Sequence, residues 1–152
     1  MKKRFISALF AFILIAALPF NAFAAEPTEK TNSIYFEDGS YITIILEEIT
    51  TRASGTKTAK KICNYTASDG TLCWEAVLTG SFTYTGTTAT CTASDCDVTV
   101  YESAYYVVSN TPTKNGSTAS VALTMGRKFL GITIEKKNYN WSITCDKNGN
   151  LS

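Results

Sequence analysis

Residues 72–84 read LCWEAVLTGSFTY, and this stretch decides the expected fold. Apolar or small side chains fall on every second residue, and the positions between them are mainly polar. Side chains of a β-strand point alternately to its two faces, so this period of two predicts a strand with one buried face. An amphipathic helix is the alternative, and the threonine and glycine content disfavours it. The apolar parity holds Leu72, Trp74, Ala76, Leu78, Gly80, Phe82 and Tyr84.

The residues that follow predict a hairpin. Thr85-Gly86 has the composition of a two-residue turn, and such a turn sets the register of the strands it joins. In that register the apolar residues of both strands share one face, which supports the assignment independently. The predicted pairs are Tyr84 with Thr87, Phe82 with Ala89, and Gly80 with Cys91.

Further β-prone segments lie on both sides of this hairpin. Residues 41–49 are rich in β-branched residues and follow a turn at Asp38-Gly39, whereas residues 50–61 lack apolar periodicity and predict an exposed connection. Residues 110–116 predict a loop because they contain Pro112 and Asn115-Gly116. Gly126 and Gly131 predict a bend or bulge. The other strand candidates are residues 98–108, 121–125, 130–134 and 139–145.

Six to eight short strands without a helical stripe predict one antiparallel β-sandwich or barrel-like domain over residues 34–152. Residues 25–33 are polar, contain Pro27, and predict a flexible lead-in to this domain. Five aromatic residues fall on the apolar strand faces and are expected in the core. They are Trp74, Phe82, Tyr84, Tyr139 and Trp141.

The N-terminus predicts an exported protein. Three basic residues precede an apolar run at residues 5–20, and Ala22-Phe23-Ala24 supplies the small residues of a cleavage site. We therefore expect a signal peptide over residues 1–24, cleaved between Ala24 and Ala25. A membrane anchor is the alternative, but the run is near the lower limit of about 17–25 residues and Pro19 interrupts it. The expected location is secreted or extracellular, with no stable membrane span after cleavage.

Removing the leader changes the charge of the chain. The whole chain has a formal net charge of +1, and the leader holds three of its 14 basic residues and none of its 13 acidic ones. The mature chain therefore carries −2, which gives no electrostatic footprint for nucleic acid or for an anionic membrane. A glycan or a protein at a cell surface is the expected kind of partner.

Five cysteines in an exported chain predict disulfides, and the odd number leaves at least one thiol over. Cys145 shares a strand face with Trp141, so its side chain is expected to point inward. Cys91 would lie opposite Gly80, where the missing side chain leaves room for a bridge. The favoured disulfide is therefore Cys91–Cys145, and the rival is Cys91–Cys96 across a tight turn.

A second disulfide, Cys63–Cys73, is possible. If Ile62 lies opposite Trp74 in the preceding hairpin, the two cysteines lie opposite each other, within cross-strand disulfide distance. Cys96 would then remain free and available for an intermolecular disulfide.

The sequence marks no catalytic or metal centre. It contains no histidine, which excludes Ser-His-Asp and Cys-His nucleophilic systems, and the cysteine spacing departs from zinc-binding patterns. Residues 146–150 lack the spacing of an EF-hand loop. We expect no enzyme, no metal and no cofactor. The acidic candidates for glycoside hydrolysis, which mostly fall at turns or on polar faces, are Glu37, Asp38, Glu47, Glu48, Glu75, Asp95, Asp97 and Glu102.

Three tyrosines are the candidate binding residues: Tyr101, Tyr105 and Tyr106. Because Tyr105 and Tyr106 are neighbours in a strand, they must face opposite sides, so one of them is expected to be exposed. An exposed tyrosine can stack on a sugar or anchor a protein interface. The alternative is a tyrosine on the outer face of a strand without a ligand.

Several strand and turn motifs carry a resemblance. Tyr65, the turn at residues 69–71, Trp74, LTGSFTYTGTTATCT at residues 78–92 and SITCDKNGNLS at residues 142–152 resemble small exported proteins of Gram-positive, gut-associated bacteria. The resemblance spans roughly residue 52 to the end, plus DGSY at residues 38–41. No activity is assigned to that family, so it implies no catalytic or binding residues. It implies that Cys91 and Cys145 belong to the shared pattern and that the other three cysteines are additions.

The expected function is a secreted, non-catalytic binding or interaction module that acts at the cell surface or in the extracellular space. The alternative is a small secreted effector, such as a bacteriocin-like toxin or an inhibitor.

Overall fold

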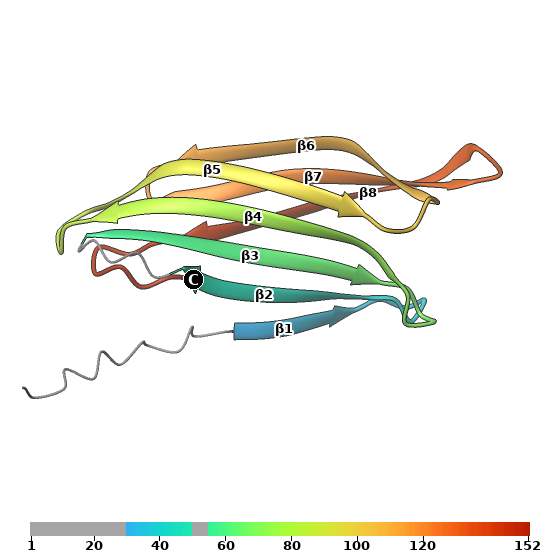
Figure 1. Ribbon diagram of the computed structural model, residues 1–152, viewed down its shortest axis with the longest axis horizontal. Helices are drawn as coiled ribbons and strands as arrows, with labels where there is room; N and C mark the ends of the chain where they lie inside the picture. The colour runs from blue at the N-terminus through green and yellow to red at the C-terminus, as the bar shows by residue number, and fades with distance from the viewer. Residues whose placement is uncertain (1–29, 50–54) are drawn as a thin grey trace, which may run out of the picture.

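The computed structural model describes residues 30–49 and 55–152, which form eight antiparallel strands in two sheets (Figure 1). Strands β1 to β5 follow one another in the first sheet, and β6 to β8 in the second. These residues include no helix that is long and apolar enough to cross a membrane. The predicted all-β sandwich is confirmed. The strands are β1 (Lys30–Tyr35), β2 (Tyr41–Ile49), β3 (Thr56–Thr66), β4 (Leu72–Tyr84), β5 (Ala89–Val100), β6 (Tyr105–Asn115), β7 (Thr118–Phe129) and β8 (Ile132–Thr144).

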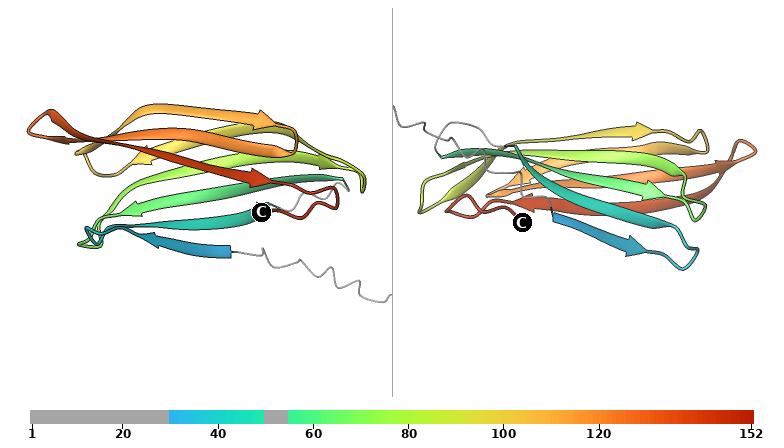
Figure 2. Two further views of the ribbon diagram at one scale, coloured as in Figure 1. Left: turned by 180° about the vertical axis from the view of Figure 1, so that it is seen from behind. Right: turned by 60° about the horizontal axis from the view of Figure 1, so that its bottom comes forward.

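The two sheets pack face to face, as the two views of Figure 2 show, and an aromatic cluster lies between them. Trp74 of β4 is fully buried and stacks on Tyr65 of β3, with ring centroids 5.5 Å apart. The same indole makes a T-shaped contact with Tyr139 of the opposite sheet, with ring centroids 5.1 Å apart. The alternation read from residues 72–84 is present in the burial of β4, where residues 74, 76, 78, 80 and 82 are buried.

The hairpin between β4 and β5 differs from the predicted register. Tyr84 pairs with Ala89 and Phe82 with Cys91, so the loop has four residues rather than two. Thr85 organises this loop, because its backbone N–H donates to the Thr88 carbonyl at 3.0 Å. Between the loop and Cys91 the error is a shift of two residues, which keeps these side chains on their faces. Apolar alternation therefore cannot detect it.

A β-bulge follows in the same hairpin. The register shifts between Ser81 and Phe82, and Thr92 of β5 is the extra residue. A bulge of this kind reverses the parity of the strand beyond it. Cys91 and Cys96 therefore both point into the core although one number is odd and the other even.

Two stretches predicted as irregular are strands. Residues 56–61, assigned to an exposed connection, form the first half of β3; all of them pair with β4, and residues 58–61 also pair with β2. Ala59 is fully buried there, but its flanking residues Lys57, Lys60 and Lys61 conceal the periodicity. Residues 30–33 of the predicted lead-in belong to β1. The signal peptide, its cleavage site at Ala24 and Ala25, and residues 25–29 and 50–54 lie outside the described residues.

The predicted loop at residues 110–116 is also mostly strand. β6 runs to Asn115, and the turn to β7 consists of Gly116 and Ser117 alone. Pro112 is tolerated because β6 lies at the edge of its sheet, where a missing backbone N–H need not break a ladder.

The β7–β8 hairpin projects beyond the other strands at one end of the sandwich, in orange and red in Figure 1. Phe129 pairs with Ile132 across the turn residues Leu130 and Gly131, whose φ angles are 49° and 79°. The predicted bend is present as this turn, with a register shift between Arg127 and Lys128.

Gly80 provides a test of the core packing. A Cβ at this position would lie 2.7 Å from the Phe82 ring and 2.9 Å from the Cβ of Ala119 on β7. The space that the sequence analysis assigned to a Cys91 bridge is therefore filled by these two side chains. We expect Gly80→Ala to lower the free energy of unfolding by about 1–3 kcal/mol, the usual cost of overpacking. Urea denaturation measures this change.

The matched control is Thr83→Ala on the exposed part of the same strand, which should change stability by no more than about 0.5 kcal/mol. A Gly80→Ala protein as stable as the wild type would contradict the close approach of β4 and β7.

Candidate functional site

The two sheets differ in width, and this difference creates the candidate site. Five strands face three, and the edge strand β8 lies against β3. The inner faces of β1 and β2 therefore extend past the edge of β8 without a strand opposite them. This overhang is visible in the left view of Figure 2, where β1 lies apart from the second sheet.

An apolar groove of about 320 Å³ lies between the overhang and the edge of β8. Ile34 of β1 and Ile42 and Ile44 of β2 line one side of it. Tyr139 and Trp141 of β8 line the other side. The three isoleucines come together because Ile34 pairs with Ile42, and Ile44 is two residues further along the same face of β2. We call this site the β8 groove.

A cation lies at one end of the β8 groove. The Lys137 ammonium lies 5.2 Å from the centroid of the Phe36 ring, and both residues line the groove. Phe36 is held by the turn after β1, where the Gly39 N–H donates to its carbonyl. The Asp38 carboxylate closes the same turn by accepting from the Ser40 hydroxyl and N–H, and these bonds hold the pKa of Asp38 below its usual range.

Polar groups of β8 face the β8 groove. The Lys61 ammonium of β3 donates to the Ser142 carbonyl at 2.5 Å, so this carbonyl points away from β7. Alternate residues of an antiparallel edge strand present their backbone N–H and C=O to the same side. The backbone groups of Asn138 and Asn140 therefore also point away from β7. The indole N–H of Trp141 is buried and has no hydrogen-bond partner within residues 30–49 and 55–152. The site thus offers an apolar wall and the backbone groups of a strand edge.

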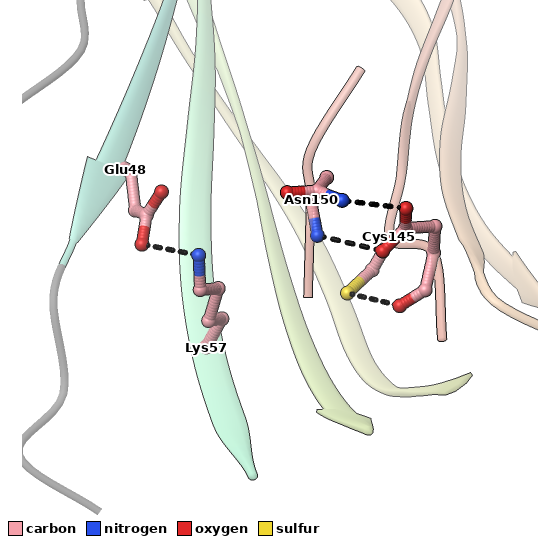
Figure 3. Close-up of polar contacts among 5 residues, drawn as sticks. Glu48, Lys57, Cys145 and Asn150 are labelled. Atoms are coloured by element: carbon pink, nitrogen blue, oxygen red, sulfur yellow. Dashed lines mark hydrogen bonds and ion pairs between the residues drawn. The ribbon is translucent and has the colours of Figure 1, made fainter. Parts of the chain in front are cut away.

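A second, charged hollow of about 180 Å³ lies beyond Lys61 under the same overhang. The Glu48 carboxylate and the Lys57 ammonium form an ion pair at 2.6 Å there, shown in Figure 3. Asn150 lines the hollow from the C-terminal segment, and its side-chain amide donates to Asp146 at 2.7 Å. The Asn150 bonds hold the pKa of Asp146 below its usual range. Because Glu48 and Lys57 neutralise each other, this hollow offers less to a charged ligand than its composition suggests.

The three candidate tyrosines do not form one cluster. Tyr101 lies in the loop after β5 and is half exposed. Tyr105 faces the core, where its ring lies 5.7 Å from that of Tyr65, and burial raises the pKa of its phenol. Tyr106 faces the other side and donates or accepts a hydrogen bond at 2.7 Å with the Thr133 hydroxyl. Tyr105 and Tyr106 face opposite sides as expected, but both are half-buried, so the prediction that one of them is exposed is wrong. Neither lines the β8 groove.

The five cysteines are buried free thiols. The predicted Cys63–Cys73 pairing is wrong, because Cys63 lies opposite Ala76, three residues from Cys73 along β4. Three residues of strand span about 10 Å, beyond the Cα separation that a disulfide allows. The rival Cys91–Cys96 bridge is also wrong, because both residues belong to the continuous strand β5 and no tight turn separates them.

Cys91–Cys145 stays a prediction, and the backbone supports it. The Cys91 N–H donates to the Gly116 carbonyl, and the Cys145 N–H donates to the adjacent Ser117 carbonyl. The two cysteines therefore flank one turn. Burial raises the pKa of the Cys145 thiol, Asp146 adds to this rise, and Cys91 is close enough to contribute a smaller part. We expect the protein recovered from an oxidising medium to yield a Cys91–Cys145 linked peptide on non-reducing mass mapping. Free thiols at both positions would contradict the bridge.

Cys96 is buried, which argues against the predicted intermolecular disulfide. Burial, with Asp95 and Asp97 adding to it, raises the pKa of this thiol to about 11 from an ordinary 9.0. Below pH 9 both folded and unfolded thiols keep their proton. Above it the unfolded thiol ionises first, so stability falls as the pH rises toward 11.

We therefore expect the free energy of unfolding, measured in urea with reductant, to fall between pH 8 and 10. Cys96 should account for about 1 kcal/mol of this fall. The Cys96→Ala protein should show a correspondingly smaller decline, and an unchanged decline would show that the thiol is not desolvated. Burial also raises the pKa of Cys63, to about 12. Cys63 therefore adds to the fall in stability at high pH in both the wild type and Cys96→Ala.

The β8 groove is not predicted by the sequence pattern. Trp141 and Tyr139 were assigned to the core, and Ile34 was placed in no strand. The sequence does hold one indication of the groove. Ile34, Ile42 and Ile44 are apolar residues on two adjacent strands, and such a surface is usually buried against another element. Which strand covers them depends on how the sheets stack, which the local pattern does not encode.

No protein-family model matches the chain, and no curated protein is similar to it in sequence. Among solved structures, the chain is similar to the crystal structure of hypothetical protein lmo2686 from Listeria monocytogenes EGD-e. The two share 18% sequence identity, with a TM-score of 0.47. The match covers 81% of this chain and 91% of that chain.

Proposed function

We propose that the chain is an exported, non-catalytic binding module that holds an extended peptide segment in the β8 groove. The observation that carries this proposal is the missing fourth strand of the second sheet. An extended segment laid along β8 would pair with its open edge and lie beneath β1 and β2. Addition of a strand to an exposed sheet edge is a common mode of peptide recognition, in which the backbone supplies affinity and pockets for alternate side chains supply specificity.

The chemistry of the β8 groove defines the ligand. One face of the added strand would meet Ile34, Ile42 and Ile44, so its alternate side chains should be apolar. Its backbone would meet the outward N–H and C=O groups near Asn138 and Asn140.

A glycan fits these features less well. Sugar recognition by aromatic residues needs an exposed ring face, whereas Tyr139 is committed to the edge of Trp74 and is partly buried. The acidic residues do not argue for catalysis either. Glu48 is paired with Lys57, and Asp38 is bonded within its own turn.

Synthetic peptides test the proposal. The probe is a nine-residue peptide with isoleucine alternating with threonine and lysine, titrated against the purified protein while tryptophan emission is recorded. We expect saturable binding that changes the emission of Trp141. In Trp141→Phe only Trp74 emits, and its emission should not change when the peptide is added. The same peptide with N-methylated amides at alternate positions should bind at least tenfold more weakly, because it cannot pair with a strand edge.

Two isoleucine variants localise the site. Ile34→Asp places a charge in the β8 groove and should weaken peptide binding at least tenfold, and its 46% exposure makes the change tolerable to the fold. Ile49→Asp is the matched control, because Ile49 is 39% exposed and does not line the groove. Equal loss in both variants would contradict the assignment, as would binding of chitin oligosaccharides without binding of the peptide.

A further inference from the structure

The end of the β7–β8 hairpin exposes four large apolar side chains. Phe129, Leu130, Ile132 and Ile134 are 65%, 86%, 70% and 56% exposed. The hairpin projects past the rest of the sandwich in both Figure 1 and Figure 2, so no other element of the described chain covers this end. We call these four residues the apolar tip.

Leu130 occupies the apex of the tip at a cost to the fold. Leu130 and Gly131 both have positive φ, at 49° and 79°, and they link a directly paired Phe129 and Ile132. This is the geometry of a type I′ turn, whose first position favours Asn, Asp or Gly. A leucine is strained there and, at 86% exposure, gains almost no contact in return. Its presence therefore needs a reason outside the folded chain.

The neck of the hairpin carries cations beside aromatic rings. On one face the Lys128 ammonium lies 4.4 Å from the centroid of the Tyr106 ring. Tyr106 lies flat over Gly126, where a Cβ would come within 2.3 Å of its ring, and its hydroxyl bonds with Thr133. On the other face the Arg127 guanidinium lies 5.8 Å from the Tyr105 ring.

The charge of the hairpin is opposite to that of the rest of the mature chain. Residues 127–137 hold four basic residues and one acidic residue, and the acidic one, Glu135, is paired with Lys137 at 3.1 Å. Charges farther away than a Debye length, about 8 Å at physiological salt, are largely screened. A surface approached by the hairpin therefore meets its local positive charge, and the net charge of the whole chain is a poor guide to this contact.

We propose that the apolar tip inserts into the surface of an anionic lipid membrane. The order of side chains along the hairpin supports this occupant: apolar residues at the apex, then tyrosines and basic side chains at the neck. A bilayer presents the same order in depth, with hydrocarbon below an interface that favours aromatic rings and below anionic phosphates that attract lysine and arginine. Peripheral attachment by one hairpin is reversible and needs no membrane-spanning segment.

Vesicle flotation tests the inference with the purified protein. The probes are vesicles of phosphatidylcholine alone and of phosphatidylcholine with phosphatidylglycerol in equal parts. We expect binding to the anionic vesicles that weakens as salt is raised, and at least tenfold weaker binding to the neutral ones. Lys128→Gln and Lys136→Gln should each weaken binding about fivefold, the factor expected for one basic residue near an anionic surface.

Leu130→Asn distinguishes an effect on vesicle binding from an effect on folding stability. Asparagine suits the strained turn position, so this variant should unfold at an equal or higher temperature and yet bind anionic vesicles at least tenfold more weakly. Leu72→Asn is the control, because the same exchange at another exposed leucine should leave vesicle binding unchanged. Ile34→Asp should also leave it unchanged, which keeps this test independent of the β8 groove.

Three results would overturn the inference. One is the absence of binding to anionic vesicles, and another is full retention of binding by Leu130→Asn. The third is concentration-dependent dimerisation in lipid-free buffer that Leu130→Asn abolishes, measured by sedimentation velocity. That result would assign the apolar tip to a second copy of the chain.

Discussion

The contact of Trp74 with both sheets is the interaction on which the structure depends. Its indole stacks on Tyr65 within the first sheet and meets Tyr139 of the second by its edge, and it is fully buried. A large rigid ring in this position sets which strands face each other, because β8 must lie where Tyr139 reaches β4. With β8 placed there, β1 and β2 have no strand opposite them. The groove is therefore a consequence of core packing and not a separate feature.

The opposite edge of the sandwich is closed by different means. There the backbone of β5 bonds to the β6–β7 turn through Cys91 and Gly116, and the Asn110 side chain donates to the Cys96 carbonyl. The edge beside β8 has Lys61 as a bridge between sheets. The side of β5 and β6 is thus held by hydrogen bonds and by the short chain segment between Val100 and Tyr105. The side of β8 is held by aromatic contacts and by the Lys61 ammonium. A ligand that enters from the side of β8 meets the side with fewer such bonds.

Much of the fold could be predicted from the sequence, and the reasons for the failures are specific. The alternation in residues 72–84 and the β-branched run in residues 41–49 predicted two strands to the residue, because each has one buried face. The first half of β3 was missed because lysines surround its one small buried residue, Ala59. The β4–β5 register was wrong by two residues next to the loop, a shift that alternation cannot detect, and by three beyond the bulge at Thr92. The candidate site was not predictable, because it depends on the number of strands in each sheet and on which edges face each other.

The open edge of β8 also bears on edge-to-edge aggregation. A long strand with free backbone groups is a template for pairing with another chain, and proteins commonly protect such edges with charge. The Lys61 ammonium donates a hydrogen bond to the Ser142 carbonyl, and Lys136 and Lys137 lie toward the other end of β8. Between them the edge is open only along a few residues beneath β1 and β2. The lysines that flank the β8 groove therefore also restrict edge-to-edge pairing of β8 with a second sheet.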